Sequence, residues 1–301
     1  MVTKLKDLNV NSNIIAWILD FLTGRAQYVK LNKTISSTIP INTGAPQGCV
    51  LSPTLYTIYT NDYRSKHPHS TAILKFTCIQ GFIGPKSSEN DYFDEVKCFV
   101  EWCKVNFLTL NVSKTKEMII DFRHKKEQIC QLSIDEKHIQ LCTSYKYLGF
   151  TIDEKLNWHQ HITIMSKKVN QRLFFLRKLR AFNVDKEVLH LFYNAVVQSI
   201  LTFGISCIGE TIALKDKKML NRSIRKSGKI TSKTLPTFEE LYEQYATSKA
   251  ISILKDTTHP MFKEFIRSDR SKRLIQPKTN TERYRKSFVP SMSRRLRSTN
   301  T

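Results

Sequence analysis

A glycine-rich loop at residues 44–48 is the first place where residue types and spacing suggest chemistry. Gly44, Pro46, Gln47 and Gly48 lead into an apolar segment, 49–60, with the composition of a mostly buried helix. Glycines let a nucleotide approach the backbone closely, a glutamine amide can hydrogen-bond to it, and a helix N-terminus favours phosphate charge. The same residues also suit a plain tight turn before a helix. Composition alone favours neither interpretation.

A basic amphipathic segment at 167–180 is the second candidate. It contains six basic residues and no acid, and Leu173, Phe174 and Leu176 lie among them. Such a helix can contact a phosphate backbone, a membrane surface or a partner helix. A further basic group in the tail includes Arg283, Arg294 and Arg297, and it suits nucleic acid, a nuclear import signal or a merely solvated tail.

The overall charge points to a polyanion partner. The 301 residues include 48 Lys and Arg against 26 Asp and Glu, for a net charge of +22. Nucleic acid is the first expectation and an anionic membrane surface the second, although a basic solubilising surface is the simpler alternative. Seven cysteines without a C-x-x-C pair favour reduced thiols in an intracellular protein, in the nucleus or cytoplasm. We expect neither a signal peptide nor a membrane span.

The elements that must position these groups fall into two parts. Helices are predicted at 12–23 and 88–106, and strands at 26–32, 34–42, 71–76, 78–84, 116–122 and between 131 and 152. From 159 onward the pattern is helical, over 159–181, 185–203, 212–228 and 237–255. The tail from 261 is predicted to be loosely ordered. The fold class is therefore α+β, with a helical second part.

Several stretches, in order, resemble the reverse transcriptase of LINE-type (non-LTR) retrotransposons. "GAPQGCVLSPTLYTIYTND" looks like motif B of that family, "WCKVNFLTLNVSKTKEMIIDFR" looks like motif D, and "YKYLGFTID" looks like the primer-grip hairpin. "QRLFFLRKLRAFNV", "FYNAVVQSILTFGISCI" and "RYRKSFVPSMSRRLR" resemble the region beyond. The chain is thus identified as a C-terminal fragment of such an enzyme. The resemblance implies the fold of a truncated right-hand polymerase. We expect a partial palm at 1–157, a helical thumb-like region at 158–255 and a basic tail at 256–301.

The resemblance assigns roles to particular residues. Gly44, Pro46, Gln47, Gly48 and Lys114 would bind the nucleotide, although Lys114 is better interpreted as a solvated loop lysine. The primer grip would comprise Tyr147, Leu148 and Gly149. The nucleic-acid backbone would contact Lys167, Lys168, Arg172, Arg177 and Arg180. The implied partner is RNA or an RNA–DNA hybrid, and no small-molecule substrate is inferred.

The catalytic carboxylates of the family are missing. The family uses two Mg²⁺ ions, held by an aspartate of motif A and an aspartate pair of motif C. Motif A precedes the segment with which this chain begins. The pair is expected between Phe76 and Thr77, where it is absent, and no acidic residue occurs from Tyr63 to Ser88. Cys78 is a poor Mg²⁺ ligand, and Asp7 and Asp20 are interpreted as surface carboxylates.

The missing pair should also affect the fold and the activity. A hairpin that loses its tip lacks the turn of about two residues that joins its strands, so we expect a distorted central hairpin. We predict no catalytic residue, no bound metal and no cofactor in this chain. We therefore expect the protein to be a degenerate remnant of an RNA-directed DNA polymerase that no longer catalyses the reaction. The alternatives are a non-catalytic nucleic-acid-binding fragment and a remnant without function or from an imperfect gene model.

A second, shorter resemblance covers residues 166–201. This segment is similar to the N-terminal segment of the tRNA-modifying AlkB homologue 8. No H-x-D…H iron triad and no glycine-rich methyl-donor loop is present, so neither activity of that protein is expected here. The histidines, including His159 and His161, show no metal-binding spacing and are interpreted as surface residues.

Overall fold

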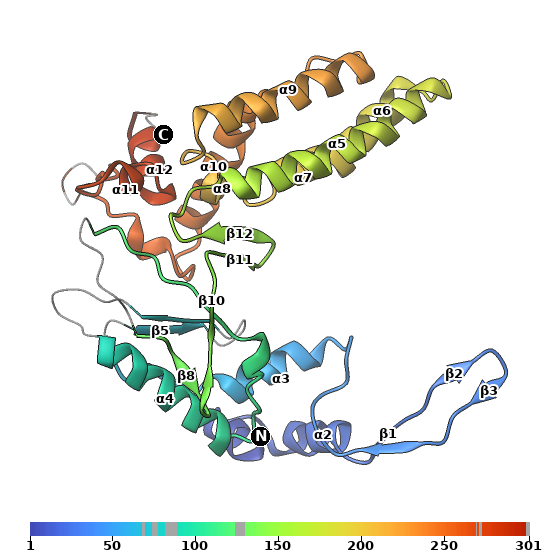
Figure 1. The fold of residues 1–301 in the computed structure, drawn as a ribbon, viewed down its shortest axis with the longest axis vertical. Coiled ribbons are helices and arrows are strands. Elements are labelled where there is room, and N and C mark those ends of the chain that lie inside the picture. The colour runs from blue at the N-terminus through green and yellow to red at the C-terminus, as the bar shows by residue number, and fades with distance from the viewer. Residues whose placement is uncertain are drawn as a thin grey trace. The chain divides into compact units, whose positions relative to one another are not determined.

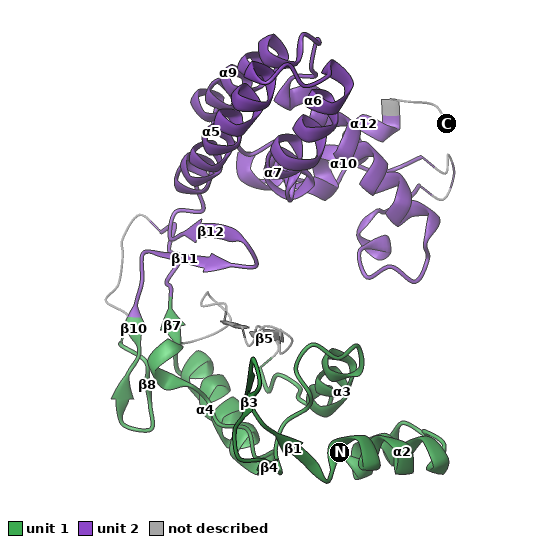
Figure 2. Cartoon of the chain, turned by 90° about the vertical axis from the view of Figure 1, so that its right-hand side faces the viewer, with its two compact units in different colours: residues 1–117, 127–140 green, residues 118–126, 141–301 purple. Residues whose placement is uncertain are grey.

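The chain forms two compact units in the computed structural model, which describes residues 1–67, 70–73, 78–81, 89–123, 130–268, 270 and 273–298. Unit 1 comprises 1–117 and 127–140, and unit 2 comprises 118–126 and 141–301 (Figure 2). The division between the units differs from the sequence-based boundary near 157. The predicted primer-grip hairpin belongs to the helical unit because Phe150 packs against the core of that unit.

The first helices of unit 1 share a small apolar core. Helices α1 (Val2–Asp7), α2 (Ser12–Leu22) and α3 (Leu51–Thr60) meet through four buried side chains, Leu5, Ile15, Ile18 and Leu55. The Asn11 side chain caps α2 by accepting a hydrogen bond from the Asn13 N–H at 2.9 Å. The helix predicted at 12–23 is confirmed, with its last residue at Leu22.

Every β-sheet in the described part of the chain has two strands. The long ribbon after α2 (Figure 1) consists of β1 (Arg25–Gln27) with β4 (Ile39–Ile41) and β2 (Lys30–Leu31) with β3 (Thr34–Ile35). Both pairs are antiparallel and lie within the two strands predicted at 26–32 and 34–42. The further short pairs of unit 1 are β8 (Ser133–Ile134) with β9 (Lys137–His138) and β7 (Lys116–Glu117) with β10 (Gln140–Leu141). The strand predicted over 116–122 is therefore regular only at its start.

The central hairpin consists of β5 (Ser70–Ile73) and β6 (Cys78–Gly81). The two strands are antiparallel and in register from Ser70↔Gly81 to Ile73↔Cys78. The described strands thus pair regularly. The distortion was expected at the tip of the hairpin, so this pairing does not test it. Phe76 and Thr77, where the missing carboxylates were expected, lie outside the described residues.

Helix α4 (Glu89–Val105) supports the segment that precedes the central hairpin. Its apolar face buries Val96, Phe99 and Cys103. Its fully buried Glu95 accepts hydrogen bonds from the Tyr63 hydroxyl at 2.5 Å and from the N–H of Lys66 at 2.9 Å. A buried carboxylate needs such partners to offset its loss of hydration. The segment 63–67 is thereby fixed to α4.

Unit 2 starts with the hairpin of β11 (Ser144–Tyr147) and β12 (Phe150–Asp153) and continues as helices. Its helices are α5 (His159–Ala181), α6 (Lys186–Phe192), the π-helical η3 (Tyr193–Gln198), α7 (Ser199–Thr202), α8 (Ile205–Ile208), α9 (Leu214–Thr231), α10 (Phe238–Lys255), α11 (Glu282–Arg285) and α12 (Phe288–Ser298). One large apolar core joins them. The helices predicted at 159–181, 212–228 and 237–255 are confirmed within a few residues.

The segment 186–208 is long and apolar enough to cross a membrane by length and composition. The expectation of no membrane span rested on there being no apolar stretch of about 18 residues, and that premise is wrong. Core helices of folded domains can have the same length and composition. In this segment Leu189, Val197 and Leu201 are core residues. The helix predicted at 185–203 ends at Thr202, and Gly204 adopts a left-handed conformation before α8 starts.

Helices α5 and α9 lie side by side (Figures 1 and 2). The buried face of α9 carries small residues, and Ser223, Ser227 and Thr231 are almost completely buried. The Ser227 and Thr231 hydroxyls donate to carbonyls one turn earlier, so their burial leaves no unpaired donor. Small side chains allow the large apolar residues of α5 to come close to the α9 backbone.

The C-terminal segment is folded over its described residues, and the prediction of a loosely ordered tail is wrong. Met292 is fully buried, and Phe265 and Leu274 join the same core. The error arose because composition counts charges, whereas folding depends on where the few apolar residues lie. In α12, Phe288, Met292 and Leu296 recur every four residues, which puts them on one helix face.

Candidate nucleic-acid interface

The glycine-rich loop 44–48 of unit 1 connects β4 to α3 and is held at both ends. The Arg25 guanidinium donates to the carbonyls of Thr43 at 3.1 Å and Gly44 at 2.5 Å, and the Ser52 hydroxyl donates to the Pro46 carbonyl. Gly44 and Gly48 have φ angles of +70° and +81°, a region that suits glycine. The Gln47 side chain is exposed. The loop is thus a fixed turn whose amide faces solvent.

The start of α3 carries a polarised thiol. Val50 at the N-cap contributes no side-chain hydrogen bond, and the Sγ of Cys49 accepts from the Leu51 N–H at 3.3 Å. Burial by itself raises the pKa of the Cys49 thiol, but hydrogen bonds from Leu51 and Ser52 outweigh it and lower that pKa below its ordinary value. The helix start therefore favours negative charge on this side chain.

Lys114 is the last residue of a 3₁₀ turn, η2 (Val112–Lys114). The turn is capped by Asn111, whose side chain accepts from the Lys114 N–H at 3.1 Å. The Lys114 side chain is exposed, and within the described part of the chain no hydrogen bond or ion pair joins it to the loop at 44–48. The structure thus does not bring Lys114 into contact with the other predicted nucleotide-binding residues.

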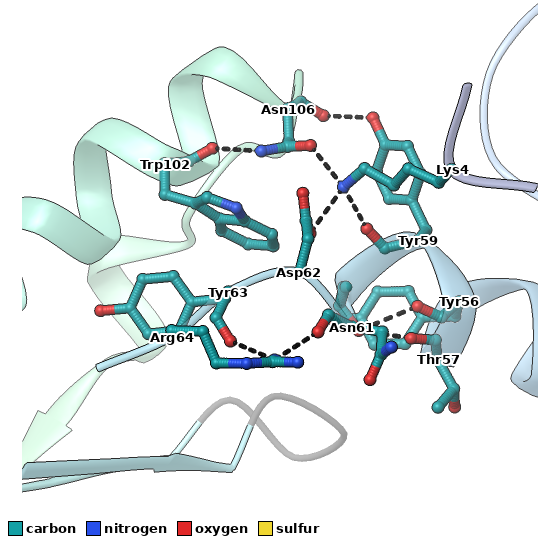
Figure 3. Close-up of polar contacts among 11 residues, drawn as sticks. Lys4, Tyr56, Thr57, Tyr59, Asn61, Asp62, Tyr63, Arg64, Trp102 and Asn106 are labelled. Atoms are coloured by element: carbon teal, nitrogen blue, oxygen red, sulfur yellow. Dashed lines mark hydrogen bonds and ion pairs between the residues drawn. The ribbon is translucent and has the colours of Figure 1, made fainter. Parts of the chain in front are cut away.

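Asp62 is the last acidic residue before the carboxylate-free stretch, and it is already paired. The Nζ of Lys4 lies 2.8 Å from Asp62, and it also donates to the Asn106 side chain at 2.7 Å and to the Tyr59 carbonyl (Figure 3). Lys4 also lies over the rings of Tyr59 and Trp102. This ammonium ties α1 to the ends of α3 and α4. Asp62 is therefore held in a structural ion pair.

The described residues do not supply a Mg²⁺ site. Within them no group of three or more His, Cys, Asp and Glu side chains is placed to hold a metal ion. The sequence between Tyr63 and Ser88 offers no carboxylate, and Mg²⁺ prefers oxygen ligands of that kind. The donor set therefore does not fit the metal that the resemblance implies.

The predicted primer-grip residues form the turn of a tight hairpin. Tyr147 pairs with Phe150 in the strand register, which leaves Leu148 and Gly149 as the two turn residues. Both have positive φ, +49° and +89°, as in the two-residue turns that match strand twist. Leu148 is exposed. The tip of this hairpin therefore presents an apolar side chain to solvent.

An aromatic cluster docks the hairpin on the helices of unit 2. The ring of Phe150 lies 5.1 Å from that of Phe203 and 5.2 Å from that of His161. His161 is only 5% exposed, and its Nδ1 accepts from the Thr151 N–H at 3.2 Å. The interpretation of His161 as a surface residue is therefore wrong. The spacing of titratable residues gave no indication that the hairpin would cover it.

The basic residues of α5 are exposed, as a backbone-contacting helix requires. Lys167, Lys168, Arg172 and Arg177 all face solvent. Arg180 has a different role, because its guanidinium donates to the Ile230 carbonyl and to the Ser232 hydroxyl at 2.8 Å. It thereby caps the C-terminal end of α9. Arg180 is thus engaged within the unit.

The structure reveals a second basic surface on α9 that the sequence analysis did not identify. Six exposed basic residues of this helix are Lys215, Lys218, Arg222, Arg225, Lys226 and Lys229. At 3.6 residues per turn they fall within an arc of roughly 100° and extend along about 21 Å of helix. We call this set the α9 stripe. The indication in the sequence was their spacing of three and four residues, and the stretch 217–238, which contains all of them except Lys215, has no acidic residue.

Asp216 does not neutralise the α9 stripe. It is buried, and its carboxylate lies 2.7 Å from Nδ1 of His159, on the opposite side of the helix. A nearby carboxylate of α10, Glu239, accepts a hydrogen bond from Asn221 at 2.7 Å. Like charges three and four residues apart destabilise a helix slightly. The outer face of α9 thus carries repulsion that an anionic ligand would relieve.

The basic groups of the tail are mostly engaged within unit 2. Arg295 lies 2.7 Å from Glu210 and also pairs with Glu243. Arg283 donates to the Lys155 carbonyl at 3.0 Å and lies over the ring of Phe122. The number of basic residues in the tail therefore overestimates how many are available to bind a polyanion.

Two family models match the chain. The model for "Reverse transcriptase (RNA-dependent DNA polymerase)" matches residues 2–152, about half of the chain. The model for "Alkylated DNA repair protein alkB homolog 8, N-terminal" matches residues 158–199, within the first helices of unit 2. Both resemblances inferred from the sequence are confirmed.

Curated relatives point the same way. The RNA-directed DNA polymerase from mobile element jockey of Drosophila melanogaster is 29% identical over 211 residues, which cover 64% of this chain and 22% of the relative. The probable RNA-directed DNA polymerases from transposon BS and transposon X-element of the same fly are 22% and 25% identical, over 63% and 51% of this chain and 22% and 17% of their own lengths. The chain thus spans about a fifth of the length of these relatives.

No solved structure matches the chain significantly. The mixed α/β elements of unit 1, followed by helices, agree with the polymerase-like fold that the family match implies. By that match, this chain belongs to the reverse transcriptase family.

Proposed function

We propose that this chain is a non-LTR reverse transcriptase remnant that binds RNA or an RNA–DNA hybrid without extending a primer. The observation that carries the loss of catalysis is the carboxylate-free sequence from Tyr63 to Ser88. The family chemistry requires two metal ions held by carboxylates. Asp62, the acid nearest in sequence before this stretch, is paired with Lys4. Losing these ligands abolishes metal-dependent catalysis rather than weakening it.

The binding half of the proposal rests on unit 2. Exposed basic residues on α5 and the α9 stripe offer phosphate contacts that do not depend on base sequence. The net charge of +22 adds long-range attraction to any nucleic acid. We therefore expect affinity that decreases steeply with salt and varies little with sequence.

One experiment tests both halves. The full chain is incubated with a primed RNA template, dNTPs and Mg²⁺ or Mn²⁺, and primer extension is compared with a heat-inactivated sample. We expect no extension above that background. The same preparation is titrated into a fluorescent RNA–DNA hybrid, and we expect saturable binding. Extension would refute the loss of catalysis, whereas absence of binding at low salt would refute the binding role.

A further inference from the structure

An open hollow in unit 2 shares only Arg172 with the surfaces discussed so far. Its volume is about 480 Å³, and it lies between the second half of α5 and the α6–η3 segment. Its lining residues are Arg172, Phe175, Lys178, Leu179, Phe182, Phe192 and Val196. We call it the α5–α6 groove. Apart from the two basic residues at its rim, every lining side chain is apolar.

The large apolar side chains at this groove are unusually exposed. Phe182 is 79% exposed and Phe175 is 49% exposed, and the neighbouring Leu191 on α6 is 65% exposed. Exposed apolar patches of this kind mark interaction sites more often than isolated apolar residues do. The fold itself does not require these side chains, because α5 already fills the core with a different set of residues, including Val169, Leu173 and Leu176.

The α6–η3 segment has two apolar faces. One carries Leu189, Tyr193 and Val197, which are completely buried in the core of unit 2. Outside that face, Leu191 is exposed, and the half-buried Phe192 and Val196 line the groove. A helix that is apolar all round normally has partners all round, yet only 28% of the apolar window in 186–208 is buried. One face thus lacks a partner within the described chain.

The charge around the groove indicates what would cover it. Arg172 and Lys178 flank the apolar floor, and no acidic residue occurs from 167 to 180. The nearest carboxylates in the sequence are engaged: Asp185 caps α6, and Glu187 pairs with Lys233 at 2.8 Å. A complementary partner therefore carries acidic residues beside its apolar ones. A second copy of this chain, with its net charge of +22, is disfavoured by repulsion.

The shape favours a helix over other partners. Ten residues separate Arg172 from Phe182, which is about 15 Å along the α5 axis and matches roughly three turns of a partner helix. Apolar residues at i, i+3, i+4 and i+7 of an amphipathic helix fit such a groove. A membrane surface favours a protruding apolar face over a concave one. Nucleic acid would find few polar groups on this floor to contact its bases or sugars.

The match to the alkB homolog 8 family model adds an independent observation. Residues 158–199 include every lining residue of the groove. The match does not extend to unit 1, where the reverse transcriptase match mostly lies. The groove thus lies wholly within a segment that is similar to a second family as well. We propose that the α5–α6 groove is a docking site for an acidic amphipathic helix of another protein.

The test uses designed peptides and the full chain. Two fluorescent 18-residue peptides carry leucines at i, i+3, i+4 and i+7, one with glutamates and one with lysines at the flanking positions; a third scrambles the glutamate peptide. We expect the glutamate peptide to bind at least about tenfold more tightly than the other two. Phe182→Gln should abolish that preference. Phe174→Gln, on the same helix but outside the lining, should leave it unchanged.

A charge swap separates docking from a loss of structure. Lys178→Glu should weaken binding of the glutamate peptide and strengthen binding of the lysine peptide, which a misfolded variant would not do. Neutralising the α9 stripe should reduce hybrid binding and leave peptide binding intact. Equal binding of the glutamate and scrambled peptides overturns the proposal. So does Phe182-dependent sedimentation with phosphatidylserine vesicles in the absence of any peptide preference, since the groove would then be a membrane contact.

Discussion

The backbone N–H of Thr151 donates a hydrogen bond to Nδ1 of His161 at 3.2 Å, and both residues are nearly buried. This contact joins the primer-grip hairpin to α5. Because Nδ1 accepts, the ring proton of the neutral form lies on Nε2, which finds no hydrogen-bond partner within the described chain. The hydrogen bond from Thr151 thus selects this tautomer, and the contact with the Phe150 ring helps to hold the imidazole in place.

His161 should make the stability of unit 2 depend on pH. Burial, together with the charge of Lys168, lowers the pKa of His161 below its ordinary value of 6.5. Below that value the unfolded chain binds a proton that the folded chain resists, so stability is complete above about pH 6.5 and decreases as the pH falls. Thermal unfolding of the full chain between pH 5 and 8 measures this. His161→Asn, which retains an acceptor, should flatten the profile, and an unchanged profile would contradict the assignment.

Gly204, which lies against the Phe150 ring of the primer-grip hairpin, should not tolerate a side chain. A Cβ at this position would lie 2.0 Å from the Phe150 ring, and φ is +61°. Gly204→Ala should lower the free energy of unfolding of unit 2 by about 2 kcal/mol or more, because ring and backbone must both shift. Gly24→Ala is the control, since it shares a φ of +61° and has open space around the Cβ. If chemical denaturation shows that both substitutions lower the free energy of unfolding equally, the clash with the Phe150 ring contributes nothing to the effect of Gly204→Ala.

Lys4 should stabilise unit 1 specifically. Lys4→Met removes the ammonium shared by Asp62, Asn106 and the Tyr59 carbonyl (Figure 3). Leaving partly buried acceptors without a partner costs about 1–3 kcal/mol. Hydrogen exchange should show faster exchange at the ends of α3 and α4, with unit 2 unaffected. Lys6→Met, an exposed neighbour without these contacts, should change neither unit.

The α9 stripe should set the salt dependence of hybrid binding. The variant K215Q/K218Q/R222Q/K226Q/K229Q keeps good helix formers but removes five charges. Each lost phosphate contact lowers the slope of log K against log salt by about 0.9, so the slope should decrease by roughly 2 to 4.

The matched control removes five exposed lysines from unit 1, as K6Q/K30Q/K33Q/K97Q/K137Q. Both variants have the same net charge, so a purely long-range effect would lower their slopes equally. A larger decrease for the α9 variant would identify direct contacts. Equal decreases would show that α9 has no special role.

The sequence by itself determined the local features and the family. The apolar spacing of 12–23, 88–106 and 159–181 predicted α2, α4 and α5, because helical periodicity depends only on near neighbours in the chain. The quoted motifs identified the family, and the acid-free stretch from Tyr63 to Ser88 is a plain fact of composition.

Only the tertiary structure decided which side chains are free to act. His161 is buried because a hairpin ten residues earlier covers it, and Arg180 is engaged because α9 ends beside it. The tail is folded because three apolar residues of α12 reach a core built mostly from residues before 256. The α9 stripe stays unneutralised because Asp216 turns inward to His159. These outcomes depend on contacts between residues distant in sequence, which local patterns of charge and hydropathy do not encode.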